Sequence, residues 1–296
     1  MRAHHRGVEL PAIVTRRDLE LRGLPPRAIR DVLGGLTRIA PGSYAETHGL
    51  TAEQVHQLRT EAVLRRVTRV VASHVSAATI WALPLLDVHL NTVHVSPSSQ
   101  RVGRPKSGTG YRMHSLPVPA DRIRDVRGVD VTEPLLTVLD CARLLDPDWG
   151  VAIADAALRA DLITAADLRM AASQMPRQPG VGRARNLHLQ ASRLAESPGE
   201  SLLRLRLARM GLDVREQVWI GRARVDFLVG DRIVVEFDGR TKYTLHGDPA
   251  SAHWEEKRRH DALVESGYLV IHVAWADLWD ERALSRRIQA ALDARR

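Results

Sequence analysis

Two apolar runs near the C-terminus are interrupted by acidic residues. Residues 225–229 read Val-Asp-Phe-Leu-Val and residues 233–239 read Ile-Val-Val-Glu-Phe-Asp-Gly, with a Gly-Asp-Arg turn between them. β-Branched and aromatic residues on both sides of a short glycine-containing turn predict an antiparallel hairpin. Side chains alternate between the two faces of a strand, so Glu236 and Asp238 share a face and Asp226 lies across from them. The pattern therefore predicts three carboxylates gathered on one hairpin.

Helical patterns flank this hairpin. Ser-Pro-Gly at positions 197–199 punctuates the chain before Glu200 and an amphipathic segment at 201–210. A second helical pattern covers residues 252–266, and a final strand is expected at 268–275. The predicted order is helix, strand, strand, helix, strand.

An unpaired carboxylate inside a buried strand costs several kcal/mol, roughly, unless a cation or strong donors meet it. Oxygen-rich clusters of this kind suit Mg²⁺ or Mn²⁺, and the chemistry they favour is phosphodiester hydrolysis. The alternative is a salt-bridge network without a metal, in which Lys242, Arg259 or Arg222 neutralises the acids. The sequence leaves both interpretations open.

The same residues carry a family resemblance. The residues concerned are Glu200, Gln217, Val-Asp-Phe at 225–227, Val-Glu-Phe-Asp-Gly at 235–239, Glu-Lys-Arg-Arg-His-Asp at 256–261 and Gly-Tyr at 267–268. In this order they resemble the PD-(D/E)XK nuclease superfamily, and within it a bacterial domain similar to the very-short-patch repair endonuclease. The resemblance implies a restriction-endonuclease-like α/β domain at 197–296, with Mg²⁺ or Mn²⁺ bound by Asp226 and Glu236.

The resemblance also implies roles for the neighbouring side chains. Glu200 would lie at the mouth of the site as an auxiliary carboxylate, or it complements the dipole of its own helix. The superfamily has a catalytic lysine where this chain has Asp238, so Lys242 and Lys257 are the candidates to orient the attacking water. Lys257 has an alternative as a solvated partner of Asp261. His272 alternates with apolar neighbours and is expected to pack in the core.

The N-terminal segment, residues 8–48, has the outline of a winged helix-turn-helix. Thr15 is a candidate helix cap, Pro25-Pro26 starts a second helix, and the runs at 36–39 and 42–45 predict a two-stranded wing. Such a unit presents Arg27 and Arg30 to a DNA major groove, with Arg38 on the wing. Small trihelical units also serve as protein interaction modules, which is the alternative.

Residues 10–170 resemble the AbiEi-type antitoxins, transcriptional repressors of type IV toxin–antitoxin systems. The match includes Leu-Arg-Gly-Leu at 21–24, a helix at 62–73, Ser-His-Val-Ser-Ala-Ala at 73–78, a strand at 92–95 and the run 131–140. It implies a mostly helical middle domain with a small sheet at 49–175, and a toxin protein as a possible partner. His74 is expected to serve in capping and packing. Pro and Gly residues at 175–182 predict a linker and connecting helix at 176–196.

Composition adds constraints on partners and location. The 296 residues carry a net charge of +8 and a pI near 10.4, which favour an anionic partner such as DNA. Arg104 and Lys106 lie in a Gly/Pro loop that either contacts phosphates or is simply solvated. The single cysteine, Cys141, excludes an internal disulfide and is expected to be buried. No apolar run approaches the roughly 20 residues that span a bilayer, so we expect a cytoplasmic protein without a membrane partner.

The sequence as a whole predicts an α+β chain. It has an N-terminal winged helix-turn-helix, a helical middle domain with a small sheet, and a C-terminal restriction-endonuclease-like domain. The predicted function is a DNA-binding protein whose C-terminal domain is a metal-dependent endonuclease. The alternative is a non-catalytic DNA-binding regulator or antitoxin of a type IV toxin–antitoxin system.

Overall fold

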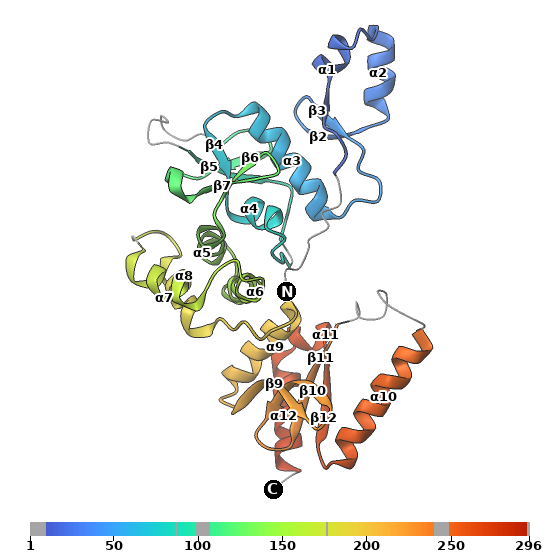
Figure 1. Cartoon of the computed structure of the whole chain (residues 1–296), viewed down its shortest axis with the longest axis vertical. Helices are drawn as coiled ribbons and strands as arrows, with labels where there is room; N and C mark the ends of the chain where they lie inside the picture. The colour runs from blue at the N-terminus through green and yellow to red at the C-terminus, as the bar shows by residue number, and fades with distance from the viewer. Residues whose placement is uncertain (1–9, 87, 99–106, 176, 240–248, 295–296) are drawn as a thin grey trace. The chain divides into compact units, whose positions relative to one another are not determined.

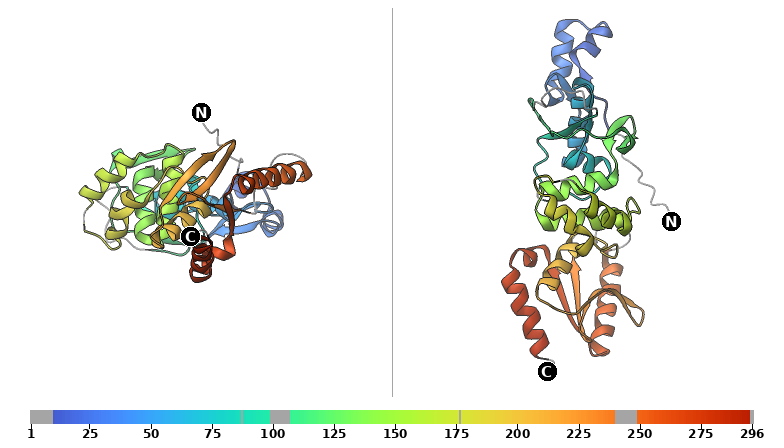
Figure 2. Two further views of the ribbon diagram at one scale, coloured as in Figure 1. Left: turned by 90° about the horizontal axis from the view of Figure 1, so that it is seen from below. Right: turned by 90° about the vertical axis from the view of Figure 1, so that its left-hand side faces the viewer.

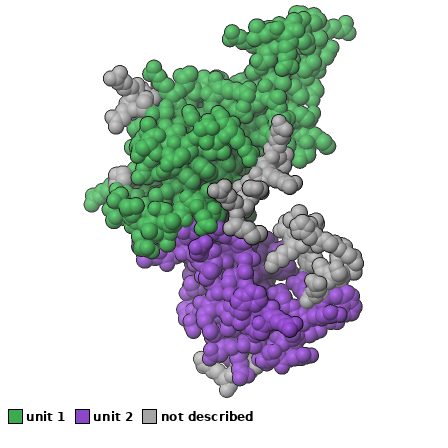
Figure 3. Space-filling model, in the orientation of Figure 1, with its two compact units in different colours: residues 1–153, 160–187 green, residues 154–159, 188–296 purple. Residues whose placement is uncertain are grey.

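The computed structural model describes residues 10–86, 88–98, 107–175, 177–239 and 249–294 (Figure 1). Helices and three sheets are mixed along the chain, which confirms the expected α+β class. Contacts divide the chain into two units, residues 1–153 with 160–187 and residues 154–159 with 188–296 (Figure 3). This division is coarser than the four segments expected from sequence, whose boundaries stay predictions. No helix among the described residues is long and apolar enough to cross a membrane.

The first unit begins with a small sheet and two short helices. These elements are β1 (Val14–Thr15), α1 (Arg16–Leu21), α2 (Pro26–Gly34), β2 (Thr37–Ala40) and β3 (Ser43–Ala45), with strand order β1-β3-β2. Thr15 caps α1, because its hydroxyl accepts from the Asp18 N–H while the Asp18 carboxylate accepts from the Thr15 N–H at 2.8 Å. Ile13 and Ile39 of this part pack against Leu58 of the next helix, α3 (Ala52–Arg66).

A five-stranded sheet follows in the same unit. Its strands and the short helices between them are β4 (Val70–Ala72), α4 (His74–Ile80), β5 (Val93–Pro97), β6 (Tyr111–Met113), η1 (Ala120–Arg122), β7 (Ile123–Val126) and β8 (Val129–Thr132). The strand order is β6-β5-β4-β8-β7. The helix expected at 62–73 is wrong in its second half, because α3 ends at Arg66 and the β-branched pair Val70-Val71 pairs with β5 instead.

Four further helices follow β8. They are α5 (Pro134–Leu144), α6 (Pro147–Arg159), α7 (Ala165–Gln174) and α8 (Val181–Gln190). Cys141 is fully buried in α5, as expected. The C-terminal part of α6, residues 154–159, belongs to the second unit. There the Asp155 carboxylate forms an ion pair with Arg204 at 2.7 Å and accepts a hydrogen bond from the Ser192 N–H at 2.7 Å. Burial is the largest influence on the pKa of Asp155 and raises it, while Arg204 opposes the rise.

The second unit contains the hairpin predicted from sequence. Its elements are α9 (Pro198–Arg209), β9 (Val214–Ile220), β10 (Ala223–Val229), β11 (Ile233–Asp238), α10 (Pro249–Glu265), β12 (Leu269–Ala274), α11 (Trp275–Trp279) and α12 (Glu281–Asp293). The sheet order is β12-β11-β10-β9. β10 and β11 are antiparallel, which confirms the hairpin, and β11 and β12 are parallel because α10 provides the crossover.

Helices cover both faces of this sheet (Figure 2). On one face Phe237 lies so close to Gly199 of α9 that an added Cβ would stand 2.1 Å from its ring. On the opposite face Leu263 of α10 packs against Val225, Leu228 and Val234. Glu236 alternates with Phe237, so it faces α10. The fold therefore presents the acidic residues of the hairpin to α10.

Candidate functional site

The two strands of the hairpin separate where the acidic residues begin. Their pairing runs from Val229 and Ile233 to Phe227 and Val235, and the next ladder position belongs to Asp226 and Glu236. There the Asp226 carboxylate accepts a hydrogen bond from the Phe237 N–H at 2.9 Å. The carboxylate thus replaces the backbone carbonyl that would accept from this N–H in a continued ladder. Asp226 is thereby fixed at the opening of the hairpin, beside the backbone of β11.

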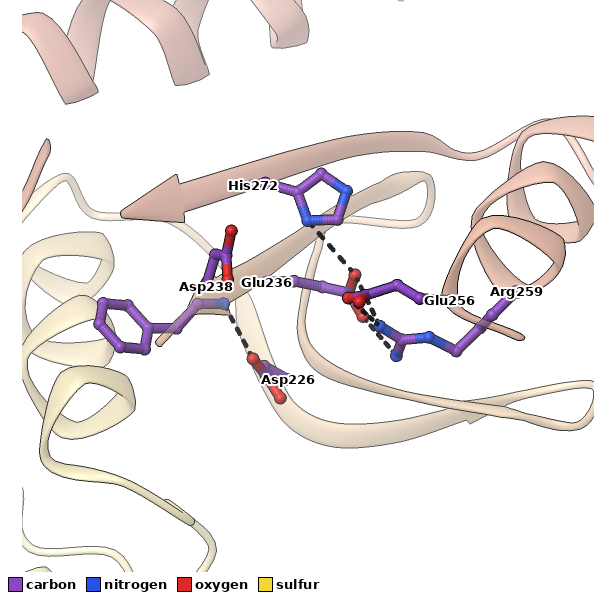
Figure 4. A pocket seen from close by; sticks show the side chains of 7 residues that line it. Asp226, Glu236, Asp238, Glu256, Arg259 and His272 are labelled. Atoms are coloured by element: carbon purple, nitrogen blue, oxygen red, sulfur yellow. Dashed lines mark hydrogen bonds and ion pairs between the residues drawn. The ribbon is translucent and has the colours of Figure 1, made fainter. Parts of the chain in front are cut away.

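A cavity of about 30 Å³ lies at this opening (Figure 4). It is bounded by residues of β10, β11, α10 and β12, namely Asp226, Glu236, Phe237, Asp238, Glu256, Arg259 and His272. A volume of this size corresponds to one or two water molecules, roughly. The structure therefore brings Asp226, Glu236 and Asp238 to one small polar cavity, as the alternation in the sequence indicated.

Arg259 dominates the electrostatics of the cavity. Glu236 is 5% exposed, and its two carboxylate oxygens accept from the two Arg259 terminal nitrogens at 2.8 and 3.3 Å (Figure 4). A bidentate guanidinium offsets much of the cost of burying a carboxylate. For Glu236 the structure thus shows the salt-bridge alternative, with Arg259 as the partner. Within the described residues, no set of three or more acidic, His or Cys side chains is arranged to enclose a metal ion.

His272 differs from its expected role in the core. Its side chain is 40% exposed and lines the cavity, with Nδ1 3.8 Å from a Glu236 oxygen and Nε2 3.3 Å from Nδ1 of His260. His272 does alternate with Ile271 and Val273 along β12. However, it pairs with Glu236 in the parallel register, so its side chain lies on the same polar face of the sheet as Glu236. The correction follows from this pairing, which a single strand does not reveal.

Glu200 is buried at the start of α9 and does not border the cavity. Its carboxylate accepts from the Ser197 hydroxyl at 2.9 Å, from the Glu196 N–H at 2.8 Å and from the Gln217 amide at 3.0 Å. The contacts with Ser197 and Glu196 lie at the N-terminus of α9, which agrees with the alternative that Glu200 complements the dipole of its own helix. Gln217 has a φ of +53°, and its amide oxygen accepts from Arg224 at 2.7 Å. A non-glycine residue held at positive φ inside a strand stores strain. Through its two hydrogen bonds, the Gln217 side chain connects Glu200 to Arg224 of β10, the strand that also carries Asp226.

The two lysine candidates have different outcomes. Lys257 is exposed on α10 with its ammonium 5.6 Å from the Trp254 ring centre, and it does not line the cavity. Lys242 lies outside the described residues, so its catalytic role stays a prediction. Asp238 is exposed and borders the cavity. Nothing in the sequence assigned a role to Glu256, whose position on α10 brings it to the same cavity.

The candidate DNA contacts of the N-terminal part are accessible where they are described. Arg27 and Arg30 are exposed and lie three positions apart on α2, so they point to the same side of the helix. Arg38 is exposed on β2. Arg104 and Lys106 lie outside the described residues. DNA binding by all five residues stays a prediction.

Comparisons with known proteins identify relatives without a described activity. No protein-family model matches the chain. Two uncharacterized proteins of Mycobacterium tuberculosis, MT2308 of strain CDC 1551 / Oshkosh and Rv2248 of strain ATCC 25618 / H37Rv, are each 29% identical over 187 residues. The match spans 59% of this chain and 66% of each relative, slightly less than two thirds of their length.

Two solved structures are partly similar. The Homing Endonuclease I-Bth0305I Catalytic Domain gives a TM-score of 0.27 at 20% identity, over 31% of this chain and 89% of that domain. The RV2827C protein from Mycobacterium tuberculosis gives a TM-score of 0.40 at 16% identity, over 66% of this chain and 76% of its own. Both scores are low, and neither structure indicates a function for this chain.

Proposed function

We propose that the C-terminal unit is a metal-dependent DNA endonuclease that hydrolyses phosphodiester bonds. The observation that supports this proposal is the convergence of Asp226, Glu236 and Asp238 on one cavity at the opening of the hairpin. Carboxylate oxygens are the donors that Mg²⁺ and Mn²⁺ prefer. Glu236 is buried, and a cation is the natural partner of a buried carboxylate.

A metal ion at this cavity would require Arg259 to move away from Glu236. Asp226 and Glu236 would hold the cation, and Asp238 would remain at the open side to position water. When bound, the ion lowers the pKa of a coordinated water and neutralises charge that grows on the phosphate. Arg259 is 35% exposed, so its guanidinium can turn from Glu236 towards solvent or towards a phosphate oxygen, which is a strong partner for this group.

The N-terminal unit would hold the DNA. Arg27, Arg30 and Arg38 are exposed cations on α2 and β2, and guanidinium groups bind guanine edges and phosphates. The net charge of +8 adds a long-range attraction to a polyanion. This part of the proposal predicts binding that weakens steeply with salt.

A second candidate is a DNA-binding regulator or antitoxin that does not cleave DNA, with a toxin protein as a further partner. The bidentate pair between Glu236 and Arg259 favours it, because the guanidinium already satisfies the buried carboxylate without a metal. Asp238 in place of the superfamily lysine favours it as well.

A plasmid-nicking assay with Mg²⁺ and with Mn²⁺ tests the first candidate. We expect nicking by the wild type and its loss, by at least about 100-fold, in Asp226→Ala and Glu236→Ala, since removal of one electrostatic group at a reacting centre has effects of this size. Asp231→Ala is the matched control, because this carboxylate of the same hairpin is 98% exposed and lies in the turn. Nicking that survives both site substitutions would reveal a contaminating nuclease and refute the proposal.

A binding assay separates the two candidates when no cleavage is seen. Electrophoretic mobility shift of a DNA duplex at several salt concentrations measures the N-terminal contribution. Retained binding without cleavage supports the regulator, and Arg27→Ala with Arg30→Ala is then expected to weaken binding and reduce its salt dependence. Loss of both activities would contradict both candidates.

A further inference from the structure

An arginine-lined hollow lies between the end of α9 and the start of α12 in the second unit. Its volume is about 420 Å³, and the charged and hydroxyl-bearing residues that line it are Arg206, Arg209, Glu281, Arg282, Ser285 and Arg286. Four guanidinium groups and one carboxylate give the hollow a net charge of +3. A concave surface with an excess of one sign of charge concentrates ions of the other sign.

The two arginines of α9 have structural partners. Arg206 is buried and binds the Glu281 carboxylate at 2.7 Å, and Arg209 lies 3.6 Å from the same carboxylate. Both arginines belong to the last turn of α9, where positive charge complements the helix dipole. The stability of the fold therefore accounts for this pair.

The two arginines of α12 have no comparable structural reason. Arg282 and Arg286 are exposed and four positions apart, so they share one side of the helix. Within the described ranges, neither of them forms an ion pair. Arg282 lies in the first turn of α12, where the helix dipole disfavours a cation. Their neighbour Arg287 differs, because it lies 3.8 Å from Asp277 and does not line the hollow.

The lining of the hollow suits phosphate oxygens. A guanidinium group donates pairs of N–H bonds to a phosphate, and Ser285 adds a hydroxyl between the two arginines of α12. Among the described residues, no aromatic ring lines the hollow, so nothing there stacks on a base. Several positive charges in one place match several phosphate groups at once, which a nucleic-acid backbone presents at regular spacing.

We propose that the hollow between α9 and α12 binds the phosphate backbone of DNA, independently of base sequence, through Arg282, Arg286 and Ser285. The hollow is on the side of the sheet that α9 covers, whereas the carboxylate cavity faces α10. A phosphate held in the hollow is therefore not the one that Asp226 and Glu236 would attack. The inference rests on DNA as the partner in the proposed function, but it does not require cleavage.

Fluorescence anisotropy with a labelled DNA duplex and the full-length protein tests this proposal. The measurement is made at several salt concentrations in a buffer without divalent ions, which prevents hydrolysis. Arg282→Gln with Arg286→Gln should lower the slope of log affinity against log salt by about 1.8, since each phosphate contact contributes about 0.9. At about 0.1 M salt, DNA binding should weaken on the order of 10- to 60-fold.

Arg215→Gln with Arg287→Gln is the matched control. These two arginines belong to the same unit, are 51% and 48% exposed and do not line the hollow. The control loses the same amount of charge, so it reports the general attraction of a basic protein to DNA. We expect it to change the affinity less than about threefold, a small effect beside that of two lost phosphate contacts. Circular dichroism should give the same spectrum for both double variants.

The outcomes separate this inference from the proposed function. DNA binding by Arg282→Gln with Arg286→Gln that equals the wild type or the control would overturn the inference and leave the proposed function intact. Absence of DNA binding by the wild type would contradict both, whereas a negative nicking assay affects neither outcome.

Sodium tripolyphosphate at constant ionic strength is a second probe, which distinguishes the DNA backbone from free phosphate. It should compete with DNA in the wild type and compete less in Arg282→Gln with Arg286→Gln. Thermal stabilisation by tripolyphosphate that this double variant loses while its DNA affinity stays unchanged would assign the hollow to free phosphate and overturn the proposal.

Discussion

Arg259→Met removes the guanidinium that binds both oxygens of Glu236 and keeps much of the apolar stem on α10. Removing one partner of a buried ion pair costs about 3–5 kcal/mol, because the other charge stays in a poorly solvated place. The Glu236 side chain is 7% exposed and that of Arg259 is 35% exposed, so water screens one end of the pair. We therefore expect a loss of about 2–3 kcal/mol in the unfolding free energy of the C-terminal unit.

Urea denaturation followed by tryptophan fluorescence measures this loss, since Trp219, Trp254, Trp275 and Trp279 all belong to the C-terminal unit. Glu236→Gln in the Arg259→Met background leaves no charge to neutralise, so the double variant should recover part of the stability. A double-mutant cycle gives the coupling energy. A stability of Arg259→Met within about 0.5 kcal/mol of wild type, the range of ordinary surface substitutions, would refute the assignment of Arg259 as the partner that stabilises Glu236.

Magnesium adds a second readout to the same variant. If Asp226 and Glu236 form the cation site, Mg²⁺ should stabilise Arg259→Met increasingly with concentration, and it should stabilise the wild type less because the guanidinium competes. Asp226→Ala in the Arg259→Met background is the control and should not respond. Absence of any response to Mg²⁺ in Arg259→Met would contradict the metal proposal and leave the ion-pair conclusion intact.

Three further predictions concern strain and protonation. Gly199→Ala should destabilise the C-terminal unit by about 1–3 kcal/mol through the clash with Phe237, and Phe237→Leu in that background should recover part of the loss in urea denaturation. Gln217→Ala should be less stable than Gln217→Gly by about 0.5–1 kcal/mol in the same assay, since both lose the contacts with Glu200 but only glycine adopts the positive φ without strain. In the unfolded chain His94 and His114 become protonated below about pH 6.5, whereas burial in the fold lowers their pKa values to about 4 and about 3. The unfolded state therefore takes up protons first, and the two histidines make the folded state less stable as pH drops through this window. Asp140, whose pKa is raised to about 7 by burial, acts with the opposite sign. His114→Asn should therefore shrink the difference in urea midpoint between pH 7 and pH 5, and an unchanged difference would contradict the assignment.

Local patterns in the sequence predicted those elements that depend on neighbouring residues alone. The hairpin around Asp226 and Glu236 follows from alternation and a glycine turn, and the Thr15 cap follows from the position of this residue directly before a helical segment. The helix expected at 62–73 from the family resemblance was wrong after Arg66, because pairing with β5 decides the state of Val70 and Val71. Contacts between distant segments override local preference in such cases.

The partners of the acidic residues depend on how α10 lies on the sheet. Leu263 sets its rotation by packing against Val225, Leu228 and Val234, and that rotation directs Arg259 to Glu236 while Lys257 points to solvent. Sequence spacing along α10 shows which residues share a side of the helix but not which side meets the sheet. For this reason the sequence named Arg259 as one of several possible partners and could not choose between them.

The position of Arg259 links the two candidate functions through one equilibrium. With the guanidinium on Glu236 the carboxylate is satisfied, and with a cation there the guanidinium must find another anion. A DNA phosphate at the same opening would supply that anion, so DNA and the divalent ion should each favour the state that admits the other. Cooperative binding of Mg²⁺ and DNA by the wild type, with weaker cooperativity in Arg259→Met, follows from this competition. Independent binding of the two in the wild type would mean that Arg259 stays on Glu236 and that the C-terminal unit binds DNA without cleaving it.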